Sequence, residues 1–218
     1  INPQSAQAEL LNEVGFEPYL RHDGIYPDDP SFDDKRESAP YTQYLRAQGF
    51  DGKNPWHDWA NAAEGENGEI LSGWKMRHAN LPARIPEQHS ETVYTTNRAI
   101  DFITEQGEKS WCLHLSYIKP HWPYIVPAPY HALYSTKSIL QPVRATPSAA
   151  SKHPVYTAFR QHEESLNFSR DSVRLNVIPT YMGLIKQVDD QLGRLFDFLQ
   201  SYGRWDDTLI VFTSDHGD

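Results

Sequence analysis

The sequence has 218 residues, 39% hydrophobic and 12% aromatic, so it is long and apolar enough to bury a core and is not typical of a disordered chain. Its 20 basic and 29 acidic residues give a formal net charge of −9, which argues against non-specific binding to nucleic acid or to an anionic membrane. The single cysteine, Cys112, excludes an intramolecular disulfide, and no stretch approaches 18 consecutive apolar residues. No secretion signal is visible, which favours a cytoplasmic location only weakly because the sequence does not begin with Met.

Two helices are predicted in the first fifty residues. The stretch 5–14 has a candidate N-cap in Ser5, and the stretch 41–48 precedes Gly49, which suits a helix end. A polar loop rich in Pro and Asp separates them. We interpret its paired aspartates as solvated surface: Asp28, Asp29, Asp33 and Asp34.

An aromatic-rich insertion, residues 51–89, shows no regular periodicity, and a loop of this length is usually functional or a surface elaboration. After it, residues 90–106 have the apolar spacing of a helix that Gly107 closes. The apolar run 111–117 is of strand type. The prolines of the next residues, IKPHWPYIVPAPY, keep them extended and irregular.

The strongest periodic signal follows a polar excursion over residues 136–172. Apolar residues recur at three- and four-residue spacing over 179–202, with Pro179 suited to the first turn and Gly203 to the end of the helix. Another strand-like run, TLIVFT, comes next. Strand, loop, long helix and strand predict an α/β chain with a largely parallel sheet flanked by helices, forming one domain over residues 1–218.

Ligands bind at the carboxyl ends of the strands in such sheets, and Asp215 and His216 occupy that position after the last run. Adjacent side chains converge there only if the backbone turns, and Gly217 supplies the freedom for a turn. Oxygen together with nitrogen ligands suits Mn²⁺, Zn²⁺ or Fe²⁺ better than Ca²⁺. The pattern alone leaves a metal site and a capping Asp beside a surface His equally open.

His121 occupies the corresponding position after the earlier run, between Pro120 and Pro123. The prolines stiffen its backbone, so its ring is presented with little loss of entropy and can donate to an anionic oxygen or act as a general acid. Lys119 lies two residues earlier and could add positive charge. A histidine packed under a proline-rich loop is the alternative, and the more common one for a lone histidine.

Together, the motifs LHLSYIKPHWPY, QVDDQLGRLFDFL and TLIVFTSDHGD, in that order, resemble the sulfatase branch of the alkaline phosphatase superfamily. The resemblance is closest to phosphonate monoester hydrolases and arylsulfatase-like enzymes. The segment GEILSGWKMRHANLPARIPEQHSETVYTTNRAIDF resembles the same branch. The resemblance extends from about Tyr44 onward and is weaker over the first forty residues.

This resemblance implies an alkaline-phosphatase-like fold and metal-dependent hydrolysis of a small anionic ester of sulfate, phosphate or phosphonate. It implies that Asp215 and His216 bind one divalent metal ion, with Mn²⁺ preferred and Ca²⁺ or Zn²⁺ as alternatives. It also implies that His121 contacts the anionic oxygens and assists the leaving group, with Lys119 a weaker substrate-binding candidate. The family's nucleophile is a formylglycine made from Cys or Ser in a C-x-P-S-R segment. A metal and fixed cations would stabilise charge on the non-bridging oxygens.

The sequence departs from that pattern at the nucleophile. Cys112 is followed by neither the Pro nor the Arg of the motif, and its place within an apolar run predicts a core residue. No C-x-P-S-R or S-x-P-S-R segment occurs, and no early strand carries paired metal-binding aspartates. We therefore expect the chain to be the middle part of a longer hydrolase, and we predict that the 218-residue polypeptide is inactive by itself.

Other polar clusters carry less weight. His57 and Asp58 are expected to form a structural hydrogen-bonded pair, and His114 to be a core or interface histidine. A cationic stretch could face an anionic substrate, form salt bridges at the surface or contact another subunit: Arg77, His78, Arg84 and His89.

Two other classes of function stay open. One is a non-catalytic relative that serves binding or assembly, and the other is a phosphodiesterase or phosphomutase relative. The motifs KPHWPY and SDHGD favour the hydrolase. The sequence leaves homo-oligomerisation open and indicates neither a nucleic-acid nor a membrane partner.

Overall fold

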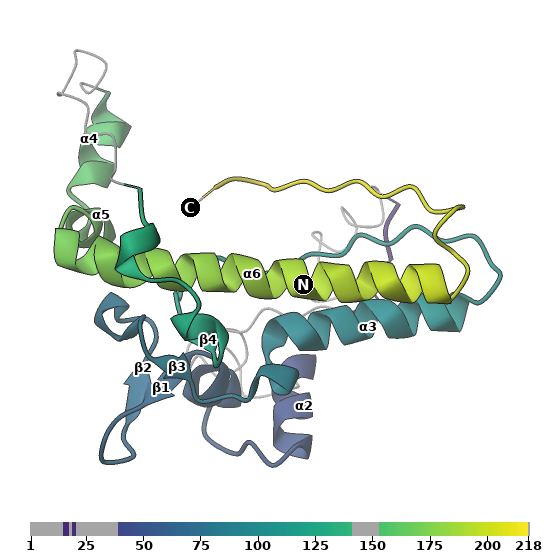
Figure 1. The fold of residues 1–218 in the computed structure, drawn as a ribbon, viewed down its shortest axis with the longest axis horizontal. Helices are drawn as coiled ribbons and strands as arrows, with labels where there is room; N and C mark the ends of the chain where they lie inside the picture. The colour runs from purple at the N-terminus through teal and green to yellow at the C-terminus, as the bar shows by residue number, and fades with distance from the viewer. Residues whose placement is uncertain (1–14, 18, 21–38, 141–152, 218) are drawn as a thin grey trace.

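A computed structural model describes residues 15–17, 19–20, 39–140 and 153–217 (Figure 1). The helix predicted over residues 5–14 and the aspartate-rich loop after it lie outside the described residues. Within the described part of the chain, no helix is both long enough and apolar enough to cross a membrane.

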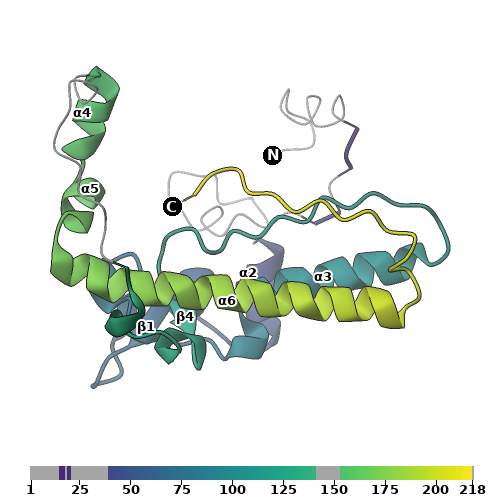
Figure 2. The same ribbon diagram turned by 45° about the horizontal axis from the view of Figure 1, so that its top comes forward.

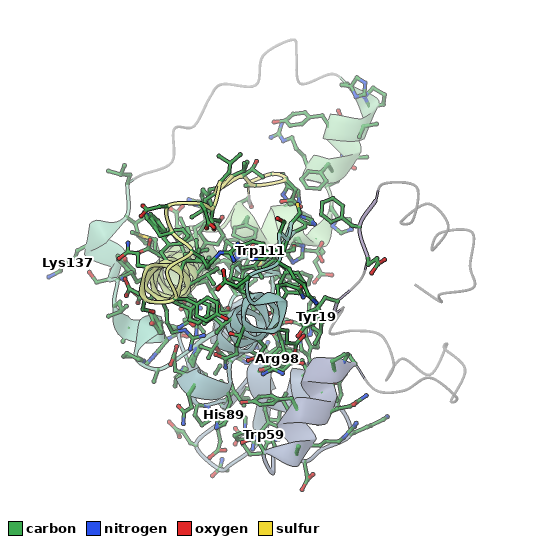
Figure 3. The ribbon with its side chains drawn as sticks, turned by 90° about the vertical axis from the view of Figure 1, so that its right-hand side faces the viewer. Tyr19, Trp59, His89, Arg98, Trp111 and Lys137 are labelled. Atoms are coloured by element: carbon green, nitrogen blue, oxygen red, sulfur yellow. The ribbon has the colours of Figure 1, made fainter. Side chains whose placement is uncertain are left out.

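Two long helices, α3 (Glu91–Gln106) and α6 (Asp171–Ser201), lie side by side at the centre of the molecule (Figures 1 and 3). α3 begins where the sequence predicts because Ser90 caps it, with Oγ accepting from the Val93 amide at 3.4 Å. Gly107, with φ of 55°, ends the helix as predicted. The two helices share an apolar cluster: Ala99, Ile103, Leu195 and Leu199.

The prediction that α6 begins at Pro179 is wrong, because the helix begins at Asp171 and Pro179 lies buried within it. An interior proline costs about 3 kcal/mol, since it removes one helical hydrogen bond and crowds the preceding turn. Tertiary contacts beside it offset that cost: the Thr180 hydroxyl donates to the Ala79 carbonyl at 2.7 Å, and both residues are buried.

Short elements cover one face of this helix pair (Figures 1 and 2). The helix predicted near residue 41 is confirmed as α2 (Pro40–Ala47). Residues 51–89 are more regular than predicted: they hold a π-helical turn η1 (Trp56–Ala60), strands β1 (Ala62–Glu64), β2 (Ile70–Ser72) and β3 (Pro82–Ala83), and 3-10 turns η2 (Met76–His78) and η3 (Glu87–His89). β1 pairs antiparallel with β2, and β3 pairs parallel with β4 (Val126–Pro127).

The core on this face is aromatic and apolar. Its buried members come from α2, the π-helical turn, the short strands and the residues beside them, and the start of α3: Tyr41, Leu45, Trp56, Ala60, Ala63, Ala83, Ile85, Tyr94 and Ile125. The stretch 51–89 is therefore part of the folded core and not only a surface elaboration.

The two runs predicted as strands, 111–117 and 208–213, are extended but pair with no strand among the described residues. Side chains along 111–117 alternate between partly buried and exposed, and the partly buried Trp111, Leu113 and Leu115 pack against the helix pair. Figure 3, viewed along the helices, shows Trp111 on the side opposite His89 and Trp59. Run 208–213 is mostly exposed, as Leu209 shows at 90%.

Cys112 is exposed, so the prediction of a core cysteine is wrong. The alternation of the extended run turns Trp111 and Leu113 inward and Cys112 outward, and no described strand covers that outer face. His114 follows the same rule: it is exposed, and its ring lies 6.0 Å from the ring of Phe16.

The described residues of the polar excursion, 136–140 and 153–172, hold the 3-10 turn η5 (Thr136–Ser138), the short helices α4 (Pro154–Arg160) and α5 (Glu163–Phe168), and the start of α6. The 3-10 turn η4 (Tyr130–Ala132) comes just before this stretch. α4 stands away from the helix pair, whereas α5 lies beside the N-terminal end of α6 (Figures 1 and 2).

Candidate active site

His121 lies at the tip of a tight loop that follows the extended run 111–117. Its amide donates to the Ile118 carbonyl at 3.0 Å, which closes the turn. The next side chain, Trp122, turns inward and meets the Trp74 ring edge to face at 4.6 Å between centroids. The loop is thus anchored on its inner side and exposes His121 on its outer side.

The tautomer of His121 is set by its own loop. Nδ1 lies 2.6 Å from the Trp122 carbonyl oxygen, and a carbonyl can only accept a hydrogen bond. Nδ1 therefore carries a proton, and Nε2 is the atom that accepts or releases a proton toward solvent. This arrangement suits an imidazole that transfers a proton at Nε2.

Lys119 is buried beneath the same loop. Its ammonium donates to the Pro123 carbonyl at 2.7 Å and to Asn61 Oδ1 at 3.0 Å. Burial lowers the pKa of Lys119 to about 8, and the negative charge of Glu91 opposes part of that shift. Its positive charge is therefore held inside the protein and not presented at the surface.

Asp215 and His216 both lie exposed at the end of the second extended run. The Asp215 carboxylate accepts from the His216 amide at 2.8 Å, and its Oδ2 lies 3.6 Å from His216 Nε2. His216 Nδ1 lies 2.8 Å from the Gly217 carbonyl, so Nδ1 carries the proton. The backbone bends at Asp215, and the chain brings one carboxylate oxygen and one imidazole Nε2 near each other.

The donor atoms of this pair are of the types that bind a divalent metal ion, because a carboxylate oxygen and an Nε2 atom are both common ligands of Mn²⁺ and Zn²⁺. The hydrogen bond at Nδ1 is the kind of support that orients a ligating histidine. Across the described ranges, no group of three or more His, Cys, Asp or Glu side chains is placed to hold a metal ion. A divalent ion bound here would take two ligands from Asp215 and His216 and would need further ligands.

The runs that carry His121 and the Asp215–His216 pair have a common course. One follows α3 and the other follows α6, and both turn back over the same face of the helix pair (Figures 1 and 2). They run side by side in the same direction, so their carboxyl ends lie toward the same end of the molecule. In a parallel α/β sheet, ligand-binding residues likewise lie at the carboxyl ends of neighbouring strands.

The cationic stretch is largely engaged in structural contacts. Arg84 lies over the Trp59 ring at 4.1 Å and pairs with Glu64 at 3.3 Å. Nδ1 of His89 lies 2.7 Å from the Tyr44 hydroxyl. Of the alternatives predicted for this stretch, Arg84 shows the surface salt bridge.

The remaining histidines and their neighbours also have structural partners. The Nδ1 atom of His57 accepts from the Trp74 indole at 3.2 Å, and the Asp58 carboxylate accepts from the Asn54 amide at 3.3 Å. Nε2 of His78 accepts from Arg77 at 3.1 Å. His57 and Asp58 both have structural partners, but they bond to Trp74 and Asn54 and not to each other, so the predicted His57–Asp58 pair is wrong.

Two buried polar residues near the loop were missed at the level of sequence. Asn61 accepts from Lys119, and Glu91 Oε1 accepts from the Trp56 indole at 3.2 Å. Asn61 lies outside the quoted motifs, Glu91 was quoted only as part of a longer segment, and only the folded chain brings both close to Lys119. The predicted helix over residues 90–106 includes Glu91, but its apolar spacing gives no signal that Glu91 is buried.

The architecture is that of the alkaline phosphatase class of α/β proteins. The fold matches the phosphonate monoester hydrolase of Agrobacterium radiobacter with a TM-score of 0.64 and 26% identity, over 81% of this chain and 35% of that one. It matches phosphonate monoester hydrolase SpPMH from Silicibacter pomeroyi with a TM-score of 0.62 and 24% identity, over 77% of this chain and 34% of that one. The predicted fold class is confirmed.

The Sulfatase family model matches residues 22–218, and the chain belongs to that family. It is 39% identical over 149 residues to the multifunctional alkaline phosphatase superfamily protein PehA of Trinickia caryophylli, covering 63% of this chain and 29% of that protein. It is 24% identical over 222 residues to an arylsulfatase of Clostridium perfringens, covering 95% of this chain and 41% of the relative. The chain thus spans well under half the length of these relatives.

Proposed function

We propose that this chain carries part of the active site of a metal-dependent hydrolase of sulfate or phosphonate and phosphate esters. The observation that carries the proposal is the shared course of two runs, one ending in His121 and the other in Asp215 and His216. Membership of the Sulfatase family supports the same class of reaction. The substrate would be a small anionic ester.

In this proposal Asp215 and His216 hold one divalent metal ion. Mn²⁺ is preferred because it accepts an oxygen and a nitrogen ligand together, whereas Ca²⁺ prefers oxygen ligands. A bound divalent ion supplies positive charge for the non-bridging oxygens of the ester and favours an ionised attacking hydroxyl. The nucleophile would be a formylglycine, and Cys112 does not provide it because its sequence context differs.

His121 acts at the leaving group in the same proposal. With Nδ1 bound to the Trp122 carbonyl, a proton held at Nε2 can pass to the leaving oxygen as its bond breaks. The protonated ring also donates to an anionic oxygen. Lys119 adds positive charge from beneath the loop, although its ammonium donates to protein oxygens.

The metal part of the proposal is tested by adding Mn²⁺ to the ¹⁵N-labelled chain and recording the paramagnetic broadening of each amide. We expect the strongest broadening at residues 215–217 and a weaker effect at His121, because the two runs end on the same side. Asp215→Ala should abolish both effects. Asp206→Asn, at an exposed carboxylate earlier on the same segment, is the matched control and should leave them unchanged.

Broadening centred elsewhere, with none at residues 215–217, would remove the metal assignment. The anion part is tested separately by titrating sulfate and phenylphosphonate while following the His121 ring signals. We expect saturable shifts of the His121 ring signals and of the amides of residues 119–123, and in His121→Gln the amide shifts should be lost. Ring signals that stay constant throughout the titration would count against His121 as the anion-binding residue.

A further inference from the structure

A buried hydrogen-bond network lies directly beneath the His121 loop. The Lys119 ammonium donates to the carbonyl of Pro123, four residues further along, at 2.7 Å. This bond ties the two ends of the loop together, and His121 lies midway between them. Only 7% of Lys119 is exposed. The tie therefore acts from inside the protein on a side chain that faces outward.

The second acceptor of Lys119 fixes the tie to the rest of the fold. Asn61 is fully buried, and its side-chain amide donates to the Trp56 carbonyl at 3.1 Å while Oδ1 accepts from Lys119 at 3.0 Å. The Asn61 carbonyl accepts from the Gly73 amide at 2.8 Å, beside the β1–β2 hairpin. Asn61 is therefore held on both sides before it meets Lys119.

The space around Lys119 leaves little room for a ligand. The adjoining cavity has a volume of about 10 Å³, which is about the space for one water molecule. Its polar lining comes from the start of α3 and from α6: Ser90, Glu91, Thr92 and Gln187. Glu91 is the charged group that faces Lys119 from these helices, and it raises the pKa of the ammonium against the effect of burial. An ester cannot approach Lys119 through this cavity.

We propose that Lys119 and Asn61 are positioning residues that hold the His121 loop in the geometry that fixes Nδ1 on the Trp122 carbonyl. The inference rests on the proposed role of His121 in anion binding. It adds that the orientation and tautomer of the ring depend on a buried amine and amide that never touch the substrate. Without the tie, the loop keeps its prolines but loses the link between residues 119 and 123.

The test compares Lys119→Met with the wild-type chain. Methionine keeps the length and burial of the side chain and removes the donors. Burial disfavours the charged ammonium, so this substitution removes an unfavourable buried charge, and we expect the variant to fold. Asn61→Leu removes the other partner and serves as an independent variant. Gln187→Met is the matched control: it removes a buried donor on the same cavity, but that donor bonds to Ser90 Oγ and not to the loop.

Two signals are measured on the ¹⁵N-labelled 218-residue chain: the hydrogen exchange rate of the His121 amide relative to amides within α3, and the ¹⁵N shift of His121 Nδ1. In Lys119→Met and Asn61→Leu we expect exchange about tenfold to a hundredfold faster, since hydrogen bonds to a charged donor contribute on that scale. The Nδ1 shift should move from a protonated nitrogen toward a mixture of tautomers. In Gln187→Met both signals should match the wild type.

Signals in Lys119→Met and Asn61→Leu that equal the wild type would overturn the inference. An equal change in Gln187→Met would also overturn it, because the effect would then be general loss of packing. The anion titration separates this result from the proposed function. If sulfate and phenylphosphonate leave His121 of the wild type unperturbed, the proposed anion role fails, whatever the exchange rates show about the tie.

Discussion

Gly183 of α6 lies against the backbone of η4, and its replacement by alanine tests that packing. A Cβ atom at this position would lie 2.4 Å from the Tyr130 carbonyl oxygen and 3.5 Å from a methyl carbon of Val126. The closer contact is with backbone, so no side-chain rotation can relieve it. One of the two elements has to move.

Two opposing effects set the size of the change. Alanine in place of glycine within a helix stabilises by about 0.5–1 kcal/mol, because the unfolded chain loses conformational freedom. Overpacking costs about 1–3 kcal/mol, and an overlap with backbone belongs at the upper end of that range. For Gly183→Ala we therefore expect the free energy of unfolding to fall by about 2 kcal/mol.

Gly193 offers the matched control in the same helix. It also lies within α6, but a Cβ atom there would meet nothing within 4 Å. Gly193→Ala should keep the helix-propensity gain without any overlap. We expect it to stabilise the chain by about 0.5–1 kcal/mol.

The assay is urea unfolding of the two variants and the wild type, followed by far-ultraviolet circular dichroism. The midpoints should move in opposite directions with unchanged slopes, because the surface exposed on unfolding is the same. A Gly183→Ala chain as stable as the Gly193→Ala chain would refute the contact between α6 and η4.

Two further predictions concern Lys119 and Cys112. Burial lowers the pKa of Lys119 from 10.5 to about 8, so between those values the unfolded chain keeps a proton that the folded chain releases, and the free energy of unfolding rises with pH. The assay is urea unfolding of the wild type and of Lys119→Met at several pH values. Relative to the variant, the free energy of unfolding of the wild type should rise by about 2 kcal/mol between roughly pH 8 and 9.5. A difference between the two chains that does not change with pH would contradict the burial of the ammonium. Cys112 is exposed, so its thiol should react with an aromatic disulfide reagent in the folded chain as fast as in urea; strong protection in the folded state would place it in the core after all.

Local signals in the sequence predict the helices whose ends are marked by capping residues. Ser90 and Gly107 bracket α3, and both act as the sequence indicates. Pro179 misleads because a proline at a helix start and one tolerated inside a helix look alike in sequence. Packing around Thr180 decides between them.

The β1–β2 hairpin was missed although its turn has a recognisable signal. Asn67 and Gly68 form the dipeptide typical of tight hairpins, and Gly68 has φ of 79°. The flanking strands are three residues each, so their alternation is too short to stand out among the aromatic residues. Pairing of β3 with β4 could not be predicted, since the partners lie more than forty residues apart.

The sequence by itself determines the extended form of runs 111–117 and 208–213 and places His121 and the Asp215–His216 pair at their ends, because alternation, prolines and glycine act over a few residues. The tertiary structure alone decides that Lys119 is buried on Asn61 while His121 faces outward. Burial, and the pKa shift that follows from it, depends on which distant elements surround a side chain. No local pattern contains that information, whereas the motifs that hold His121, Asp215 and His216 are local and can be read directly from the sequence.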